Sequence, residues 1–289
     1  MSGGSSSHEA RGTSHIDAAS ISSTVAALLQ QPRRGTVLAT FARSAYLDVE
    51  DSIVAIVAED LLNGPLNVVL PESSTPPFER LTVGGPVTAS EETLRVDAWP
   101  SIALHRATRW DPRITPWTMT QMMNVMRHVD VLMGTTLATT STEHLMHRRM
   151  QQALAGLRSG LRMRSPVEVQ TAAGDLAGLG AGLTPSGDDV LVGALVALAA
   201  LPDDHTDLRE AIRSATAGRT TRISAAYLQA AAGGDASEAW QRLLAALAGD
   251  APDDVIATGR HMLTYGETSG ADMLTGFILA MANLYDLHN

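Results

Sequence analysis

The sequence predicts an α+β protein, in which a small, β-rich, barrel-like N-terminal domain precedes a mostly α-helical C-terminal domain. Two observations predict this class. Between Gly35 and Ala107, short runs rich in Val, Leu and Ile alternate with turns that contain Gly and Pro, which is typical of strands. From Thr118 onward, apolar residues recur at helical spacing, and the low aromatic content of 4% favours close-packed helices.

Composition divides the 289 residues into three parts. Residues 1–20 are polar and rich in Gly and Ser, so they bury too little apolar surface to fold and are expected to form a disordered tail. Residues 21–112 form the expected β-rich domain, in which 21–31 is a short leading helix. Residues 113–289 form the expected α-helical domain, which carries the glycine-rich motifs described below.

The expected strands and helices follow from these patterns. The strands are Thr36–Phe41, Ile53–Val57, Leu66–Leu70, Leu81–Val83, Leu94–Val96 and Ser101–Leu104. The helices of the second domain are 118–133, 142–160, 166–175, 188–201, 206–217, 222–232, 236–248, 252–264 and 271–286.

The charge balance excludes several partners. The formal net charge is −10 without a Lys/Arg cluster, so neither nucleic acid nor an anionic membrane surface is an expected partner. The chain has no cysteine and therefore no disulfide or thiolate zinc site. Without a secretory signal or an apolar run of about 20 residues, the chain is expected to be soluble and cytoplasmic.

A glycine-rich stretch with the sequence GLGAGLTPSGDDVLVG occupies residues 178–193. Its glycines, which include Gly180, Gly182 and Gly187, come just before a long apolar run. Thr184 is expected to cap a buried helix that has Pro185 at its first position. Because free amides and the helix dipole point out of a helix N-terminus, this loop is a candidate anion site.

The same pattern returns near the C-terminus. Ser186 to Gly193 and Ser269 to Gly276 share the sequence S-G-x-D-x-L-x-G, in each case preceded by a threonine, Thr184 or Thr268. Two loop-to-helix units of one design suggest two helix N-termini that converge on one pocket. The alternative is that these serines and aspartates only cap helices.

Three aspartates lie in these motifs: Asp188, Asp189 and Asp272. Carboxylates repel an anion, so a divalent cation such as Mg²⁺, or a ligand amide or ammonium group, would have to lie between them. A carbamoyl NH₂ group would be a suitable donor. The sequence does not choose between these options, and no residue is assigned as a metal ligand.

A further helix begins within the sequence GRTTRIS, residues 218–224. Arg219 and Arg222 could hold a ligand carboxylate or phosphate through paired hydrogen bonds. The alternative is a solvated helix start with a threonine cap.

The strings GLGAGLTPSGDDVLVGAL, TTRISAAYL and GETSGADMLTG, in this order, resemble the AllH-type subunit family of oxamate carbamoyltransferase, over about residues 33–285. The resemblance implies one subunit of a three-subunit enzyme of anaerobic allantoin breakdown. That enzyme uses phosphate to split oxalurate into oxamate and carbamoyl phosphate.

The leading hypothesis is therefore a carbamoyltransferase subunit, with Asp188, Asp189 and Asp272 as catalytic candidates. Phosphate or carbamoyl phosphate and a small carboxylate are the expected ligands, and other subunits are expected partners. The residues expected to bind them are Gly180, Gly182, Thr184, Ser186, Gly187, Arg219, Arg222, Thr268, Ser269 and Gly270. The alternatives are a non-catalytic assembly or anion-binding subunit of such a complex, and a metal-dependent hydrolase.

Overall fold

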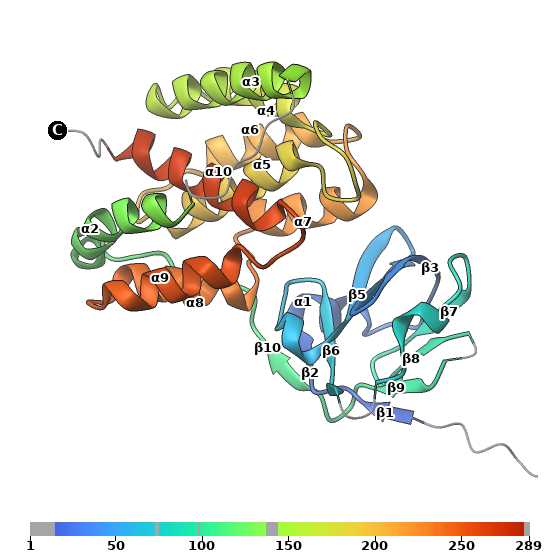
Figure 1. Ribbon diagram of the computed structural model, residues 1–289. Helices are drawn as coiled ribbons and strands as arrows, with labels where there is room; N and C mark the ends of the chain where they lie inside the picture. The colour runs from blue at the N-terminus through green and yellow to red at the C-terminus, as the bar shows by residue number, and fades with distance from the viewer. Residues whose placement is uncertain (1–14, 73–74, 98, 137–143, 286–289) are drawn as a thin grey trace, which may run out of the picture. The chain divides into compact units, whose positions relative to one another are not determined.

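The structure, a computed structural model, describes residues 15–72, 75–97, 99–136 and 144–285 (Figure 1). It confirms the α+β class, with a curled, half-barrel sheet over residues 15–110 and a helical region after it. The chain divides into two compact units. The first contains the described residues up to 21 together with 25–61 and 68–109, and the second contains 22–24, 62–67 and the residues from 110 onward.

Ten strands of the described residues form one sheet in the order β1-β9-β8-β7-β3-β4-β5-β6-β2-β10. Most of the pairs are antiparallel, whereas β1 runs parallel to β9. The strands are β1 (His15–Asp17), β2 (Ser20–Ser22), β3 (Arg33–Phe41), β4 (Ser44–Val49), β5 (Ser52–Ala58), β6 (Asn67–Leu70), β7 (Pro86–Ala89), β8 (Thr93–Val96), β9 (Ser101–Ala103) and β10 (Thr108–Trp110). Alternate residues such as Val37, Leu47 and Leu94 point into a common apolar core, as a sheet with one buried face requires.

Two expectations for this region are wrong. Residues 15–20 of the expected tail contain β1 and the start of β2, because Ile16 pairs with Ile102 and is buried in the core. Leu81–Val83 is not a strand; it follows the short 3-10 helix Phe78–Arg80 and leads into β7. The leading helix α1 (Ser23–Leu28) is shorter than expected.

Nine long helices follow in the described part of the second unit. They are α2 (Met119–Thr136), α3 (His144–Arg162), α4 (Pro166–Leu176), α5 (Ser186–Ala200), α6 (Thr206–Thr216), α7 (Arg222–Ala232), α8 (Glu238–Ala248), α9 (Pro252–Met262) and α10 (Ser269–Leu284). Each coincides with an expected helix to within a few residues at its ends. Among the residues described, no helix has the length and apolar character needed to cross a membrane.

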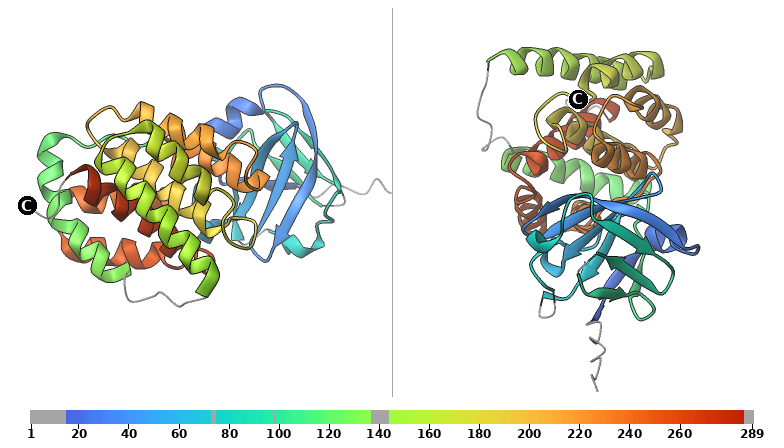
Figure 2. Two further views of the ribbon diagram at one scale, coloured as in Figure 1. Left: turned by 90° about the horizontal axis from the view of Figure 1, so that it is seen from above. Right: turned by 90° about the vertical axis from the view of Figure 1, so that its right-hand side faces the viewer.

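Helices α5 and α10 lie at the centre of the helical unit, with the other helices around them (Figures 1 and 2). In α5, 12 of the 15 residues are buried, which confirms that this helix is apolar on nearly every face. Phe277 of α10 packs against Trp117 and Trp240, with ring centroids 6.4 and 5.2 Å apart. The two motif-bearing helices therefore form the core of this unit.

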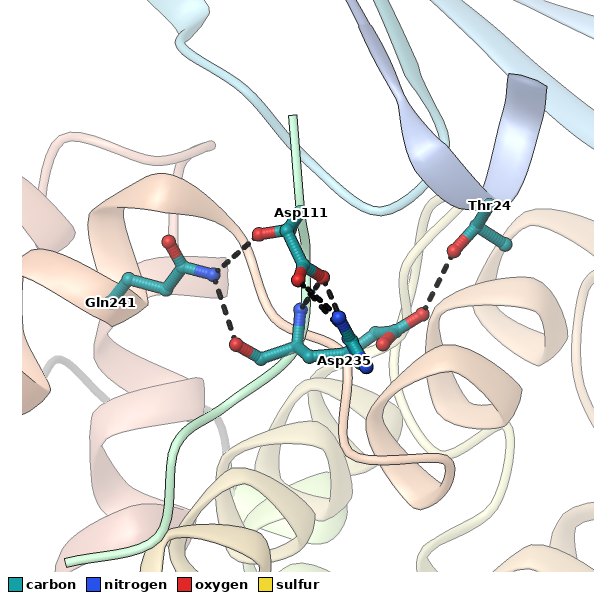
Figure 3. A network of polar contacts seen from close by, with 5 residues as sticks. Thr24, Asp111, Asp235 and Gln241 are labelled. Atoms are coloured by element: carbon teal, nitrogen blue, oxygen red, sulfur yellow. Dashed lines mark hydrogen bonds and ion pairs between the residues drawn. The ribbon is translucent and has the colours of Figure 1, made fainter. Parts of the chain in front are cut away.

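A polar network of the second unit ties the segment that enters α2 to the turn between α7 and α8 (Figure 3). Arg113 pairs with the Asp111 carboxylate at 2.6 Å, and the Gln241 amide donates to the carbonyls of Asp111 and Arg113 at 3.0 and 3.3 Å. Thr24 donates to Asp235 at 3.1 Å. All of these side chains hydrogen-bond within the chain, so the network has a structural explanation.

Candidate functional site

The two glycine-rich motifs meet where α5 crosses α10. A Cβ atom added to Gly193 would lie 1.8 Å from the Met273 carbonyl oxygen, and one added to Gly276 would lie 1.8 Å from the Val190 carbonyl oxygen. Val190 and Met273 hold equivalent positions in the two motifs. The crossing is therefore reciprocal, and only glycine allows the two backbones to come so close.

The two helix starts are also built alike. The amide of Gly187 donates to the Leu179 carbonyl at 2.8 Å, and the amide of Gly270 donates to the Tyr265 carbonyl at 3.0 Å. Both glycines are buried. These two amides are engaged inside the chain, so their expected role as ligand-binding amides is corrected to a role in packing.

The aspartate of each motif reaches the serine of the other motif. Asp189 of α5 is hydrogen-bonded to Ser269 at the start of α10. Asp272 of α10 is hydrogen-bonded to Ser186 at the start of α5. A threonine from the start of its own motif completes the contacts of each carboxylate: Thr184 for the first and Thr268 for the second.

The hydroxyl groups also connect the two helix starts directly, because Thr184 Oγ1 and Ser269 Oγ lie 3.2 Å apart. The structure thus brings six of the expected site residues into one cluster, which we call the crossed-motif site. Its members are Thr184, Ser186, Asp189, Thr268, Ser269 and Asp272.

Burial dominates the electrostatics of this site. It raises the pKa of Asp189 to about 7; the hydrogen bond from Ser269 opposes this rise, and the negative charges of Asp272 and Asp188 add to it. Asp189 is only 6% exposed. A carboxyl group in such a place holds its proton far more strongly than one in water.

Burial also affects the carboxyl group of Asp272. Burial raises the pKa of Asp272, and its hydrogen bonds with Ser186 and Thr268 oppose the rise. One oxygen of each carboxyl group, Oδ2 of Asp189 and Oδ2 of Asp272, is buried and has no hydrogen-bond partner. Such atoms are rare in native proteins and call for a ligand or a proton to satisfy them.

Asp188 has a different place from Asp189. It is fully buried and accepts hydrogen bonds from the Gly178 amide at 3.0 Å and from the Thr220 hydroxyl. It therefore holds the glycine loop against the segment that precedes α7. The sequence contains a hint of this difference, because Ala271 stands at the equivalent position of the second motif.

Removing the hydroxyl group from this contact is expected to destabilise the protein. Thr220→Val leaves the buried Asp188 carboxylate with one donor fewer, which costs about 2 kcal/mol. Urea unfolding measures this change, with Thr171→Val as a control because Thr171 is exposed in α4. Equal midpoints for both variants would contradict the structural role assigned to Thr220.

The glycine loop bends back over the start of α5. Gly180 has a φ of +129°, and a Cβ atom there would lie 2.6 Å from the Ser186 amide nitrogen. Gly182 is exposed and has open space around it. Thr184 was expected to cap α5, but the N-cap is Pro185 and the helix begins at Ser186. The Thr184 hydroxyl instead contacts Ser269.

The two arginines lie beside the loop and not among the six residues of the crossed-motif site. Arg219 donates to the Gly174 carbonyl of α4 at 3.3 Å. Arg222 is exposed at the first position of α7. Thr221 caps this helix and donates to the Leu183 carbonyl at 2.5 Å, so the arginines are anchored next to the loop.

In the part of the chain that the structure describes, no group of three or more His, Cys, Asp or Glu side chains is placed to hold a metal ion. The Mg²⁺ option stays a prediction that binding measurements can test.

Part of the chain matches a known protein family. Residues 176–281 match the family model described as oxamate carbamoyltransferase subunit AllH. No curated protein and no solved structure matches the chain. The matched segment is shorter than the resemblance over residues 33–285 expected from the sequence, and it does not include the sheet. It runs from the end of α4 into α10, contains both glycine-rich motifs and supports an AllH-type family for this chain.

Proposed function

We propose that this chain is a carbamoyltransferase subunit whose crossed-motif site binds the carbamoyl ligand. The reaction is the phosphorolysis of a ureido carboxylate, oxalurate and phosphate giving oxamate and carbamoyl phosphate. One observation carries the proposal. Asp189 and Asp272 reach across to each other's motif, and each keeps one buried carboxyl oxygen without a hydrogen-bond partner.

The chemistry of the site favours a ligand with both N–H groups and negative charge. An unpartnered carboxyl oxygen accepts a hydrogen bond when it is ionised and donates one when it is protonated, so the pair fits the NH₂ and C=O groups of a carbamoyl ligand. The starts of α5 and α10 bring positive helix-dipole ends to the same place, which favours an anion. Carbamoyl phosphate and the ureido acid carry both features.

Each remaining residue takes a role that its position allows. The backbone of Gly180, Gly182 and Ser186, at the open turn before α5, would bind phosphate or a developing oxyanion. Arg219 or Arg222, after release of its present partner, would hold the substrate carboxylate; for Arg219 this partner is the Gly174 carbonyl. Catalysis would then rest on positioning and charge stabilisation.

Calorimetric titration of the purified chain with phosphate, carbamoyl phosphate and oxamate, with and without Mg²⁺, tests this function. We expect Asp272→Asn to weaken carbamoyl phosphate binding at least about tenfold, because the loss of one charged hydrogen bond costs about 1.5–3 kcal/mol. Asp175→Asn is the matched control, since Asp175 is an exposed aspartate of neighbouring α4. Unchanged affinity in Asp272→Asn would contradict the proposed site.

The glycines at the helix crossing favour a second candidate function, in which the chain is a non-catalytic assembly subunit. Gly193 and Gly276 are explained by the helix crossing, without any ligand. In that case the other subunits of the complex would supply the chemistry. No binding of any of the three ligands by the isolated chain, together with binding by the assembled complex, would favour this alternative.

A further inference from the structure

The crossed-motif site is nearly symmetric in its hydroxyl groups but not in its charges. Asp189 and Asp272 are equivalent residues of the two motifs, and each meets a serine of the other motif. The residue before Asp189, however, is the buried Asp188, whereas the residue before Asp272 is Ala271. Asp189 is also the more deeply buried of the pair.

These facts distinguish the two carboxyl groups. Two carboxylates that share one poorly solvated site cannot both carry a full charge without a large cost, so one of them keeps a proton. The third negative charge, on Asp188, lies on the side of Asp189. We propose that Asp189 holds the proton at neutral pH and donates it to the leaving nitrogen during carbamoyl transfer, while Asp272 stays an acceptor. This inference rests on the proposed function.

The carbamoyl transfer step leaves the number of protons in the site unchanged. A phosphate oxygen attacks the carbamoyl carbon, the new C–O bond forms, and the C–N bond to the leaving amide breaks. The leaving nitrogen keeps the electron pair of that bond and takes the Asp189 proton. The proton of hydrogen phosphate then passes to Asp189, so that the pair again holds one proton. A positioned proton donor of this kind contributes about 10²–10⁴-fold to a rate.

The charged surroundings agree with this assignment. Asp272 is the only charged residue of α10, and its charge and that of Asp188 both raise the pKa of Asp189. On α6, Glu210 and Arg213 pair with each other at 2.5 Å. The other charged or titratable side chains on the helices packed against α5 are Glu168 and Asp175 on α4, Asp207 and Arg209 on α6, and Arg222 and Tyr227 on α7.

Carbon-13 NMR of the whole chain labelled at the aspartate carboxyl carbons measures the proton directly. One carboxyl resonance is expected to titrate near neutral pH and to be absent in Asp189→Asn, while Asp175→Asn retains it. Asp188→Asn is expected to move its midpoint to lower pH. If every aspartate resonance titrates below pH 5, the proton is not held on Asp189 and the inference is overturned.

Kinetics of the reconstituted enzyme test the donation. The rate of carbamoyl transfer is expected to fall as Asp189 ionises above neutral pH, and Asp189→Asn is expected to lose about 100-fold or more in kcat. A full rate in Asp189→Asn would overturn the donor role and leave the proposed function intact. If the wild-type chain and complex bind no carbamoyl ligand, the proposed function fails, and the donor role fails with it.

Discussion

Replacing Gly276 by alanine is expected to destabilise the protein by about 3 kcal/mol, because the new methyl group would overlap the backbone of α5. The added Cβ would lie 1.8 Å from the Val190 carbonyl oxygen and 3.0 Å from the Val190 Cα atom. Both of these Val190 atoms belong to the backbone, so the overlap is relieved only if α5 and α10 move apart. Both helices are buried in the same core, and their separation would open cavities around Phe277.

Urea unfolding followed by circular dichroism measures this effect, and Gly134→Ala is the matched control. Gly134 also lies inside a helix, α2, but it is exposed and has no neighbour within 4 Å of an added Cβ. Its replacement is expected to stabilise the protein by about 0.5–1 kcal/mol, because alanine loses less backbone entropy on folding. The same direction of change in both variants would contradict the close helix crossing.

The repeated motif is the part of the site that the sequence predicted well. A shared S-G-x-D-x-L-x-G pattern implies two local structures of one design, and the structure brings their starts together, with Thr184 beside Ser269. The sequence did not reveal that the glycine at the second position of each pattern serves packing. Gly187 and Gly270 face the ends of the preceding helices, and this depends on tertiary contacts that no local pattern encodes.

The adjacent aspartates show a similar limit. Asp188 and Asp189 are chemically alike and both lie in the first turn of α5, but successive helix positions point about 100° apart. One carboxylate therefore faces the glycine loop and Thr220, and the other faces α10. Helix direction and the identity of the neighbours decide their roles, and these follow only from the packed fold. Ala271, at the position equivalent to Asp188, was the available signal.

The fold was predicted more fully in its helices than in its strands. Long apolar periodicities located α2 to α10, since each spans several turns of one pattern. The strands β1, β2, β4, β7 and β10 were missed. β1, β2 and β10 have only three residues each, and β7 begins with a proline, which reads as a turn when the pairing partners of the strand are unknown.

The free energy of unfolding is expected to fall as the pH rises from about 4 to about 7, because of Asp189. Burial raises its pKa from an ordinary value of 3.8 to about 7, so between these values the folded protein binds a proton that the unfolded chain has already lost. Stability therefore decreases with rising pH in this window and is constant above it. Since one pKa unit corresponds to about 1.4 kcal/mol, ionised Asp189 costs on the order of 4 kcal/mol at pH 8.

Asp189→Asn isolates this contribution from those of other groups. The half-buried Asp272 also has a raised pKa and acts in the same direction, whereas burial lowers the pKa of His205, which makes stability rise with pH near neutrality. The contributions of Asp272 and His205 persist in the variant. The difference in the free energy of unfolding between wild type and Asp189→Asn therefore reports the contribution of Asp189. Urea unfolding from pH 4 to 8 should show that the free energy of unfolding of Asp189→Asn rises relative to that of the wild type as the pH rises. The free energy of unfolding of Asp175→Asn should change with pH as that of the wild type does. Parallel curves for Asp189→Asn as well would mean that Asp189 ionises as a surface carboxylate does, and that its burial against α10 is not maintained in solution.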